Sequence, residues 1–305
     1  MITIPPNGLI VDGGLATELE NLGQRLDHRL WSARILETDP DAIYQAHWNY
    51  LVAGAQCIIT STYQLSYQGC AELGYSHEYS QKLMLKSVNI AKQAVDDFVM
   101  QYQPTQRPWV AASVGPYAAY LADGSEYTGT YSVNELQLQE FHDERFHTLA
   151  KSSADLLACE TIPTLAEASA LKSIVANHKD IQVWVSFCCR DGRSLADGSL
   201  LSEAVGMFQA LENVLAVGIN CTAPEFIDSL LRECQRGAPN KDYVVYPNSG
   251  ECYDHHSHSW LGIDNPQHLH KMAPQWRKMG AKLVGGCCRS TPAEIRLIAE
   301  ALWSD

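Results

Sequence analysis

The residues best suited to chemistry in this sequence are cysteines. Cys287 and Cys288 are adjacent, follow two glycines and precede a segment that reads RSTPAE. Adjacent cysteines make poor disulfide partners, because a bond between them closes a small, strained ring. Two thiols side by side can instead bind one metal ion if the backbone bends, and glycines permit such a bend.

Cys221 is a third thiol in a comparable position, because it also follows a short apolar run. Three thiolates on one ion are typical of zinc, and three protein ligands leave a fourth position open for a substrate. Helix starts predicted just beyond Cys221 and Cys288, together with Arg289, favour the thiolate forms. The pattern alone also allows buried or redox-active thiols, and a second adjacent pair, Cys188 and Cys189, is interpreted as ordinary buried thiols.

Eight short apolar runs predict the strands that position these residues. The runs are continuous rather than alternating, as is typical of parallel strands buried on both faces. They are Leu9–Val11, Cys57–Ile59, Trp109–Ala112, Leu156–Cys159, Val183–Val185, Leu215–Ile219, Tyr243–Tyr246 and Lys282–Val284.

Helical patterns lie between the runs. Apolar residues from Met84 to Phe98 recur at spacings of three and four, which predicts one buried helix face. Capping boxes of the form Ser/Thr-x-x-Glu predict helix starts at Ser132, Thr164, Thr222 and Thr291. Strands and helices that alternate eight times over 305 residues predict an α/β fold, the (β/α)8 TIM barrel, as one domain over residues 1–305. A doubly wound sheet is the alternative fold.

The polar residues that follow the runs are expected to converge, since a barrel gathers the carboxyl ends of its strands at one rim. This rim is where such barrels carry their active sites. The residues expected there are Asp12, Thr60, Ser61, Glu160, Asn220, Cys221, Asn248, Ser249, Cys287 and Cys288.

Charge and hydropathy exclude several classes of function. The formal net charge is −13 and no Lys/Arg run occurs, so nucleic-acid binding is not expected. The acidic balance is compatible with a cationic substrate. No secretion signal and no apolar run long enough for a membrane helix is found, and the ten cysteines are scattered through a core-rich chain. We therefore expect a cytoplasmic protein with reduced thiols, without membrane contact and without a disulfide framework.

The sequence resembles the homocysteine S-methyltransferase family along almost its whole length. GINCT (218–222) and, far downstream, GGCCR (285–289) carry the most specific part of the resemblance. Within the family, the segment SVGPYAAYLADGSEY is most similar to enzymes that use S-methylmethionine or S-adenosylmethionine. The other matching motifs are VDGGLATELE (11–20), AGAQCIITSTYQ (53–64), SVGPYAAYLADGSEY (113–127), LLACETIP (156–163) and YPNSGE (246–251).

The resemblance implies a zinc-dependent (β/α)8 barrel that transfers a methyl group from a sulfonium donor to the thiol of L-homocysteine, giving methionine. It implies one Zn2+ per chain, held by Cys221, Cys287 and Cys288. A free thiol has a pKa of about 8.5 and is mostly protonated at neutral pH. Coordination to zinc removes that proton, so the bound sulfur becomes the nucleophile.

The resemblance also implies the residues that recognise the substrates. Asp12 and Glu160 are expected to bind cationic groups, with Glu160 at the homocysteine amine; a turn residue and a salt bridge are the alternatives. Trp31 and Tyr63 are candidates for cation–π contact with the sulfonium, and core packing is the alternative. Three residues of the PNSGE motif, namely Asn248, Ser249 and Glu251, are expected to shape the pocket; turn formation by Pro-Asn-Ser-Gly is the alternative.

Two other functions remain open at this stage. The chain could be a non-catalytic barrel that binds zinc or thiols, or a thiol oxidoreductase that uses adjacent cysteines. The choice between S-methylmethionine and S-adenosylmethionine also stays open. The expected partners are small-molecule substrates, and the favoured oligomeric state is a monomer.

Overall fold

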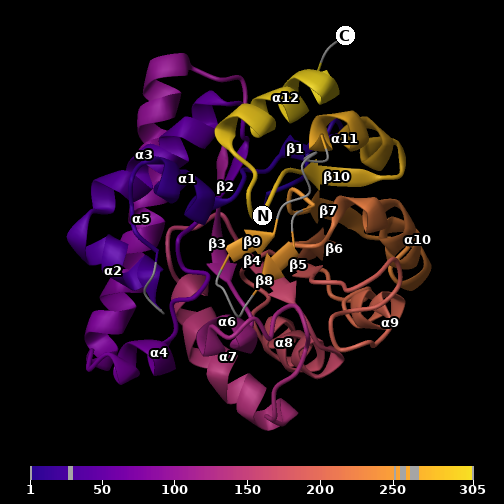
Figure 1. The fold of residues 1–305 in the computed structure, drawn as a ribbon, viewed down its shortest axis with the longest axis horizontal. Coiled ribbons are helices and arrows are strands. Elements are labelled where there is room, and N and C mark those ends of the chain that lie inside the picture. Colours follow the sequence, from indigo (N-terminus) through magenta and orange to yellow (C-terminus); the bar gives the residue numbers. More distant parts are fainter. Residues whose placement is uncertain (1, 27–29, 251, 255–258, 262–267, 304–305) are drawn as a thin grey trace.

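A ring of eight parallel strands forms the centre of the protein in the computed structural model, which describes residues 2–26, 30–250, 252–254, 259–261 and 268–303 (Figure 1). The strand order around the ring is β1-β10-β7-β6-β5-β4-β3-β2. The strands are β1 (Leu9–Ile10), β2 (Cys57–Ile59), β3 (Trp109–Val114), β4 (Leu156–Ile162), β5 (Val183–Phe187), β6 (Val214–Asn220), β7 (Asp242–Tyr246) and β10 (Ala281–Val284).

Hydrogen bonds between β1 and β2 close the ring. Val11 forms a parallel bridge with Cys57, and the Asp12 N–H donates to the Cys57 carbonyl over 3.0 Å. On the other side, β1 pairs with the last strand, with Leu9 opposite Leu283. The predicted (β/α)8 barrel is therefore confirmed, with all eight predicted strands present.

Four strands, β3, β4, β5 and β6, extend further toward their carboxyl ends than the apolar runs that predicted them. β4 continues through Glu160 to Ile162, because pairing with β5 resumes at Ile162 after a register shift that follows Cys159. β3 and β5 likewise continue through Ser113 and Ser186. Each of these apolar runs ends at its first polar residue, but the strand itself continues through that residue.

Helices surround the ring of strands (Figure 1). The predicted stripe lies on α5, where Met84, Val88, Ala91 and Val95 are buried and Phe98 packs half-buried against the core. The helices are α1 (Leu15–Asn21), α2 (Trp31–Thr38), α3 (Pro40–Val52), α4 (Tyr67–Glu72), α5 (His77–Tyr102), α6 (Tyr117–Leu121), α7 (Glu135–Ala150), α8 (Leu165–Asn177), α9 (Leu201–Gly206), α10 (Ile227–Gly237), α11 (Leu269–Lys278) and α12 (Pro292–Trp303).

Two of the four predicted helix starts need correction. Thr164 caps α8, and Glu294 accepts a hydrogen bond from the Thr291 N–H before α12. At Ser132 the prediction is wrong by two residues, because Asn134 and Gln137 form the capping box of α7. After Thr222 the chain forms only a short 3-10 helix, Pro224–Phe226, before α10.

The apolar core has two parts, divided by the strands. The larger part fills the space between strands and helices, whereas the smaller part lies inside the barrel and includes Trp184 and Tyr246. The Trp184 indole N–H donates to the Tyr246 hydroxyl over 3.0 Å, which satisfies both polar groups inside an apolar interior. This interior layer forms the floor on which the candidate site rests.

A short antiparallel pair follows β7 and was not predicted. It consists of β8 (Cys252–Asp254) and β9 (Ser259–Leu261), with Asp254 opposite Ser259. Figure 1 shows the pair projected across the ring of strands. Within the described part of the chain, every helix is too short or too polar to cross a membrane.

Candidate metal centre and substrate pocket

The three candidate cysteines lie together at the carboxyl ends of β6 and β10. Cys221 directly follows β6, and Cys287 and Cys288 come shortly after β10. Their sulfur atoms all lie within 4.8 Å of one another, and the Cys221 and Cys288 sulfurs are 3.6 Å apart. Among the described residues, this is the one group of three or more His, Cys, Asp or Glu side chains with metal-binding geometry.

Main-chain hydrogen bonds hold the two thiol-bearing loops in place. The Cys221 N–H donates to the Tyr246 carbonyl over 3.2 Å, and the Cys287 N–H donates to the Pro247 carbonyl over 2.8 Å. The loop after β7 thus supports both cysteine-bearing segments. Cys221 itself adopts a left-handed φ of 49°, which is unusual for a residue with a side chain and is held by these contacts.

Gly285 and Gly286 are required for space rather than for an unusual backbone conformation. A Cβ on Gly285 would lie 2.6 Å from the Val11 carbonyl oxygen, and one on Gly286 would lie 2.4 Å from Ser290. Neither glycine has a positive φ, whereas Arg289, just beyond the cysteines, has a φ of 65°. The glycines therefore let β10 pass close to β1, and the chain reverses at Arg289.

The donor set fits a soft divalent metal ion. Tetrahedral zinc with Zn–S bonds of about 2.3 Å places its sulfur ligands roughly 3.8 Å apart, close to the observed 3.6 Å between Cys221 and Cys288. Thiolates select zinc over hard ions such as magnesium or calcium. The three cysteines are therefore suited to hold one metal ion with a free position facing the cavity.

The thiols differ in their acidity. Hydrogen bonds from Cys221 and Cys287 lower the pKa of the Cys288 thiol, so Cys288 ionises before its neighbours. The same contacts, with burial, raise the pKa of the Cys221 thiol. The expectation that a helix start lowers the pKa at Cys221 is wrong, because α10 begins only at Ile227.

A cavity of about 160 Å3 opens beside the three sulfurs and is strongly acidic. None of the described residues that line it is Lys, Arg or His. Asp12, Glu126 and Glu160 contribute three carboxyl groups. The other lining residues are Gly13, Gly14, Leu15, Ala16, Thr17, Ile59, Thr60, Ser61, Tyr63, Tyr127, Thr161, Cys221, Tyr246, Gly286, Cys287 and Cys288.

Asp12 and Glu160 are both buried in this cavity, as their positions after or within strands predicted. Asp12 Oδ2 accepts a hydrogen bond from the Ile59 N–H over 2.8 Å, whereas Oδ1 has no hydrogen-bond partner in the described structure. Burial raises the pKa of the Asp12 carboxyl well above its usual range, and the nearby Glu160 raises it further. Asp12 therefore presents one free oxygen to a ligand.

Glu160 is held by hydroxyl groups on both sides. Ser113 donates to Oε1, and the Tyr246 hydroxyl lies 3.0 Å from Oε2. Burial is the main cause that raises the pKa of Glu160 to about 8, and the neighbouring Cys287 adds to it. A cationic group bound here would lower that pKa again, because it favours the ionised carboxylate.

Two lining residues, Glu126 and Tyr127, were missed by the sequence argument. Both belong to the segment between α6 and α7, so strand-end reasoning had no reason to select them. The Tyr127 hydroxyl lies 3.2 Å from the Cys221 sulfur. Burial raises the pKa of Glu126 to about 7, and its Oε2 is buried with no hydrogen-bond partner in the described structure. The sequence signal that could have found these two residues is the acidic and aromatic composition of the motif SVGPYAAYLADGSEY, which ends with them.

The remaining candidates occupy different places. Tyr63 lines the cavity, whereas Asn248 and Ser249 are not among its described lining residues. The N–H groups of Asn248 and Ser249 donate to the carbonyls of Thr222 and Cys288, respectively, both over 3.2 Å. Trp31 is the first residue of α2, and its side chain lies outside the described part of the structure, as does the whole of Glu251.

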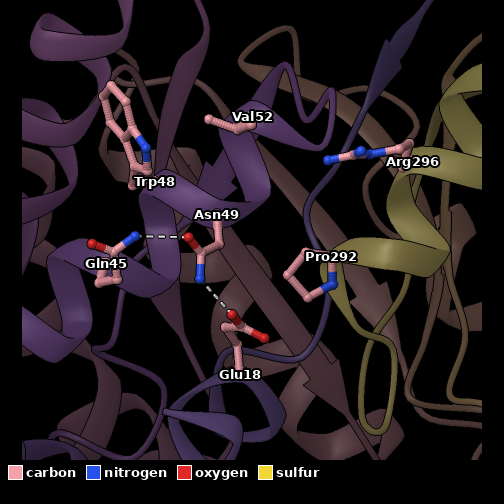
Figure 2. A pocket seen from close by; sticks show the side chains of 7 residues that line it. All are labelled: Glu18, Gln45, Trp48, Asn49, Val52, Pro292 and Arg296. Atoms are coloured by element: carbon pink, nitrogen blue, oxygen red, sulfur yellow. Dashed lines mark hydrogen bonds between the residues drawn. The ribbon is translucent and has the colours of Figure 1, made fainter.

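A second hollow of about 260 Å3 lies on the outside of the barrel between α1, α3 and α12 (Figure 2). Its carboxylate, Glu18, is occupied by a 2.6 Å hydrogen bond from the Asn49 amide, and Gln45 donates to Asn49 in turn. The hollow contains no thiol and none of the candidate residues.

Comparison with known proteins agrees with this geometry. The family model described as homocysteine S-methyltransferase matches residues 9–302. The chain belongs to the homocysteine S-methyltransferase family. It is 41% identical over 294 residues to homocysteine S-methyltransferase YbgG of Bacillus subtilis (strain 168), covering 95% of this chain and 93% of the relative.

Relatives from Escherichia coli extend the agreement to three dimensions. The homocysteine S-methyltransferase of strain K12 is 42% identical over 290 residues, covering 94% of this chain and 93% of that protein. The crystal structure of the homocysteine methyltransferase MmuM from Escherichia coli, in its metallated form, superposes with a TM-score of 0.87 at 40% identity. That comparison covers 96% of each chain. The family resemblance read from the sequence motifs is confirmed.

Proposed function

We propose that this protein transfers a methyl group from a small sulfonium donor, S-methylmethionine, to the thiol of L-homocysteine, using a zinc ion held by Cys221, Cys287 and Cys288. Methyl transfer to homocysteine is the activity named for the family and for the relatives. The observation that carries the proposal is three sulfurs within 4.8 Å of one another at the wall of an acidic cavity.

Zinc is the metal that fits a site of three cysteines with one position open. When bound, it supplies the thiolate form of the homocysteine sulfur at neutral pH and keeps that sulfur nucleophilic. The solved relative is described as metallated, which supports a metal in this site. The cysteines would place the acceptor sulfur at the wall of the cavity. The remainder of homocysteine and the methyl donor would occupy the cavity itself.

The three carboxyl groups of the cavity match the cationic groups of the two substrates in number. L-homocysteine carries one ammonium, and S-methylmethionine carries an ammonium and a sulfonium. Charge-assisted hydrogen bonds to Asp12, Glu126 and Glu160 would bind these centres, with Glu160 at the homocysteine amine. Tyr63 and Tyr127 add aromatic surface that suits a sulfonium through cation–π contact.

Cavity size favours the smaller donor. The cavity of about 160 Å3 is smaller than the ~300–1,000 Å3 of pockets that hold drug-sized ligands. S-Adenosylmethionine carries a whole adenosyl group and is such a ligand, whereas S-methylmethionine is a small amino acid. The carboxylates are the same for either donor, so volume rather than charge makes the distinction.

The bond changes in the reaction need no proton donor. A carbon–sulfur bond forms between the methyl group and the homocysteine sulfur, and the methyl–sulfonium bond breaks. Its electron pair stays on the donor sulfur, which leaves as a neutral thioether, so both products are methionine. The protein therefore mainly holds the two sulfur atoms and the methyl group in line and excludes water, which can supply several kcal/mol of the barrier reduction, on the order of 7.

The test is an assay of purified, zinc-loaded protein with homocysteine and each donor in parallel. We expect methyl transfer from S-methylmethionine to exceed that from S-adenosylmethionine. Betaine and methylfolate serve as negative controls. Activity with betaine alone would overturn the sulfonium assignment, and preference for S-adenosylmethionine would overturn the argument from volume.

Two further measurements separate the alternative functions. X-ray absorption at the zinc edge should change when homocysteine is added; an unchanged spectrum with a fourth protein ligand would indicate a structural zinc site. Thiol titration under mild oxidant should show no reversible loss of two thiols per chain, which a thiol oxidoreductase would show. One domain over residues 1–305, a monomeric state, a cytoplasmic location and no binding to nucleic acids stay predictions, and light scattering checks the monomer.

A further inference from the structure

Segment 117–131, which consists of α6 and the residues that follow it, brings two residues into the cavity, Glu126 and Tyr127. The Tyr127 hydroxyl reaches the Cys221 sulfur over 3.2 Å. The segment has no regular secondary structure of its own after α6, and it turns at Ala122 and Gly129, whose φ values are 53° and 65°. Its shape must therefore be fixed by contacts with the rest of the barrel.

Glu167, on α8, contacts both ends of this segment. Its Oε1 accepts a hydrogen bond from the Tyr117 main-chain N–H over 2.6 Å, and its Oε2 accepts one from the Tyr131 hydroxyl. The Glu167 side chain is 0% exposed and does not line the cavity. One buried carboxylate thus ties the beginning of the segment to its end.

The charge on Glu167 is balanced by a chain of two residues on α7. Arg145 donates to His142 Nδ1 over 3.1 Å, and His142 Nε2 lies 2.7 Å from Glu167 Oε1. Because an arginine can only donate, Nδ1 is the acceptor, so the proton lies on Nε2 and is donated to Glu167. Arg145 also donates to the Gly115 carbonyl, two residues before the segment starts.

We propose that Glu167 is a positioning residue, which holds Glu126 in the cavity and Tyr127 against the metal centre by clamping segment 117–131 at both ends. Three donors converge on its two oxygens, and two of the three belong to the segment. A carboxylate can accept from all of them, whereas an amide keeps one acceptor oxygen and its N–H2 group can pair only with the Tyr131 hydroxyl, which must then accept. The role in methyl transfer rests on the proposed function, but the clamp itself can be measured without the reaction.

The test compares three full-length, zinc-loaded variants with the wild type. Glu167→Gln removes the negative charge from the clamp and reverses its hydrogen bond with the Tyr131 hydroxyl, while keeping the side-chain length. Glu167→Asp keeps the charge and is the conservative rescue. Glu135→Gln is the matched control, because Glu135 also joins α7 to α8, through Ser169 at 2.9 Å, but does not touch the segment.

The first readout is amide hydrogen exchange below the melting temperature. We expect Glu167→Gln to speed exchange in residues 122–131 by about tenfold or more while α7 and α8 exchange as in the wild type. Glu167→Asp should restore much of the protection, and Glu135→Gln should leave the segment unchanged. If Glu167→Gln does not fold, Tyr131→Phe releases one end of the clamp and should speed exchange in the same residues.

The second readout is kinetic and spectroscopic. Glu167→Gln should raise KM for the sulfonium donor by about tenfold, as expected when a charged contact is misplaced, and should alter the cobalt–thiolate absorption of the cobalt-substituted protein. An exchange rate in residues 122–131 within twofold of the wild type, together with an unchanged cobalt–thiolate spectrum, would overturn the clamp. The same effects in Glu135→Gln would also overturn it. If the wild type shows no methyl transfer at all while the segment still exchanges faster in Glu167→Gln, the clamp stands and the proposed function fails.

Discussion

The sulfur atoms of Cys221 and Cys288 lie 3.6 Å apart, although 67 residues separate them in the sequence. The distance matches a shared metal ion better than it matches a disulfide, whose sulfurs are bonded at about 2.05 Å. The end of β7, which lies between β6 and β10, supports both cysteine-bearing segments through the carbonyls of Tyr246 and Pro247. The metal site is thus largely preformed by the barrel.

Substitution of Cys288 should abolish metal binding and methyl transfer together. Cys288→Ala removes the thiol that ionises first and leaves two ligands, so we expect zinc affinity to fall by about a hundredfold or more. Elemental analysis and the homocysteine assay measure the two effects. Cys234→Ala, a buried thiol on α10 outside the cluster, is the control and should keep both properties. A Cys288→Ala protein with full zinc content and activity would refute the metal assignment.

Product binding should strengthen as the pH rises from 6 to 8. Glu160 has its pKa raised to about 8, mainly by burial, so its carboxyl is mostly protonated at pH 6 and must lose a proton to bind an ammonium. Affinity should therefore fall by up to about tenfold per pH unit below 8. Methionine, which lacks a thiol, is the suitable ligand for calorimetry. In Glu160→Gln this dependence should become shallower, with a remainder from Glu126, whose pKa is raised to about 7; an unchanged slope would show that another group controls binding.

Asp12→Asn should weaken substrate binding without unfolding the protein. An asparagine oxygen can still accept from the Ile59 N–H, but the negative charge on the free oxygen is lost. We expect KM for at least one substrate to rise by about ten- to a hundredfold, the range for a charge-assisted hydrogen bond. Glu18→Gln, a buried carboxyl outside the cavity, is the matched control. Equal kinetic effects of the two substitutions would contradict a binding role for Asp12.

Gly285→Ala should destabilise the barrel at the point where its first and last strands pair. The added Cβ would lie 2.6 Å from the Val11 carbonyl oxygen and 2.8 Å from the Asp12 carbonyl oxygen, both main-chain atoms. We expect a loss of about 1–3 kcal/mol in the free energy of unfolding, measured by urea titration. Gly74→Ala meets no atom within 4 Å and tests backbone strain alone, since its φ is 80°. A smaller cost at Gly285 than at Gly74 would show that the contact relaxes freely.

The parts of the site that depend on strands could be predicted from the sequence. A buried parallel strand is an unbroken apolar run, so the residues after each run, among them Asp12, Cys221 and Cys287, could be assigned to one rim from the pattern of apolar runs. Glu160 was also found, although it lies within its strand rather than after it. Local pattern and barrel geometry together were sufficient for these residues.

Other parts could not be read from the sequence because they depend on packing between distant segments. Thr164 and Glu167 have the spacing of a capping box, and Thr164 does cap α8, yet the Glu167 carboxylate turns to α7 and to segment 117–131 instead. Glu126 and Tyr127 enter the cavity from that segment. Asn248 and Ser249 hold the thiol loops through their main chain, which residue type does not reveal.

The pairing of β1 with β10 has a consequence for synthesis of the chain on the ribosome. Asp12 emerges early, whereas the strand beside it and the two adjacent cysteines emerge after the other seven strands of the ring. Before β10 is synthesised, the nascent chain therefore has an open barrel and only Cys221 of the three candidate ligands. The last two candidate ligands and the strand that closes the ring are thus synthesised together, and a chain that ends before β10 lacks both.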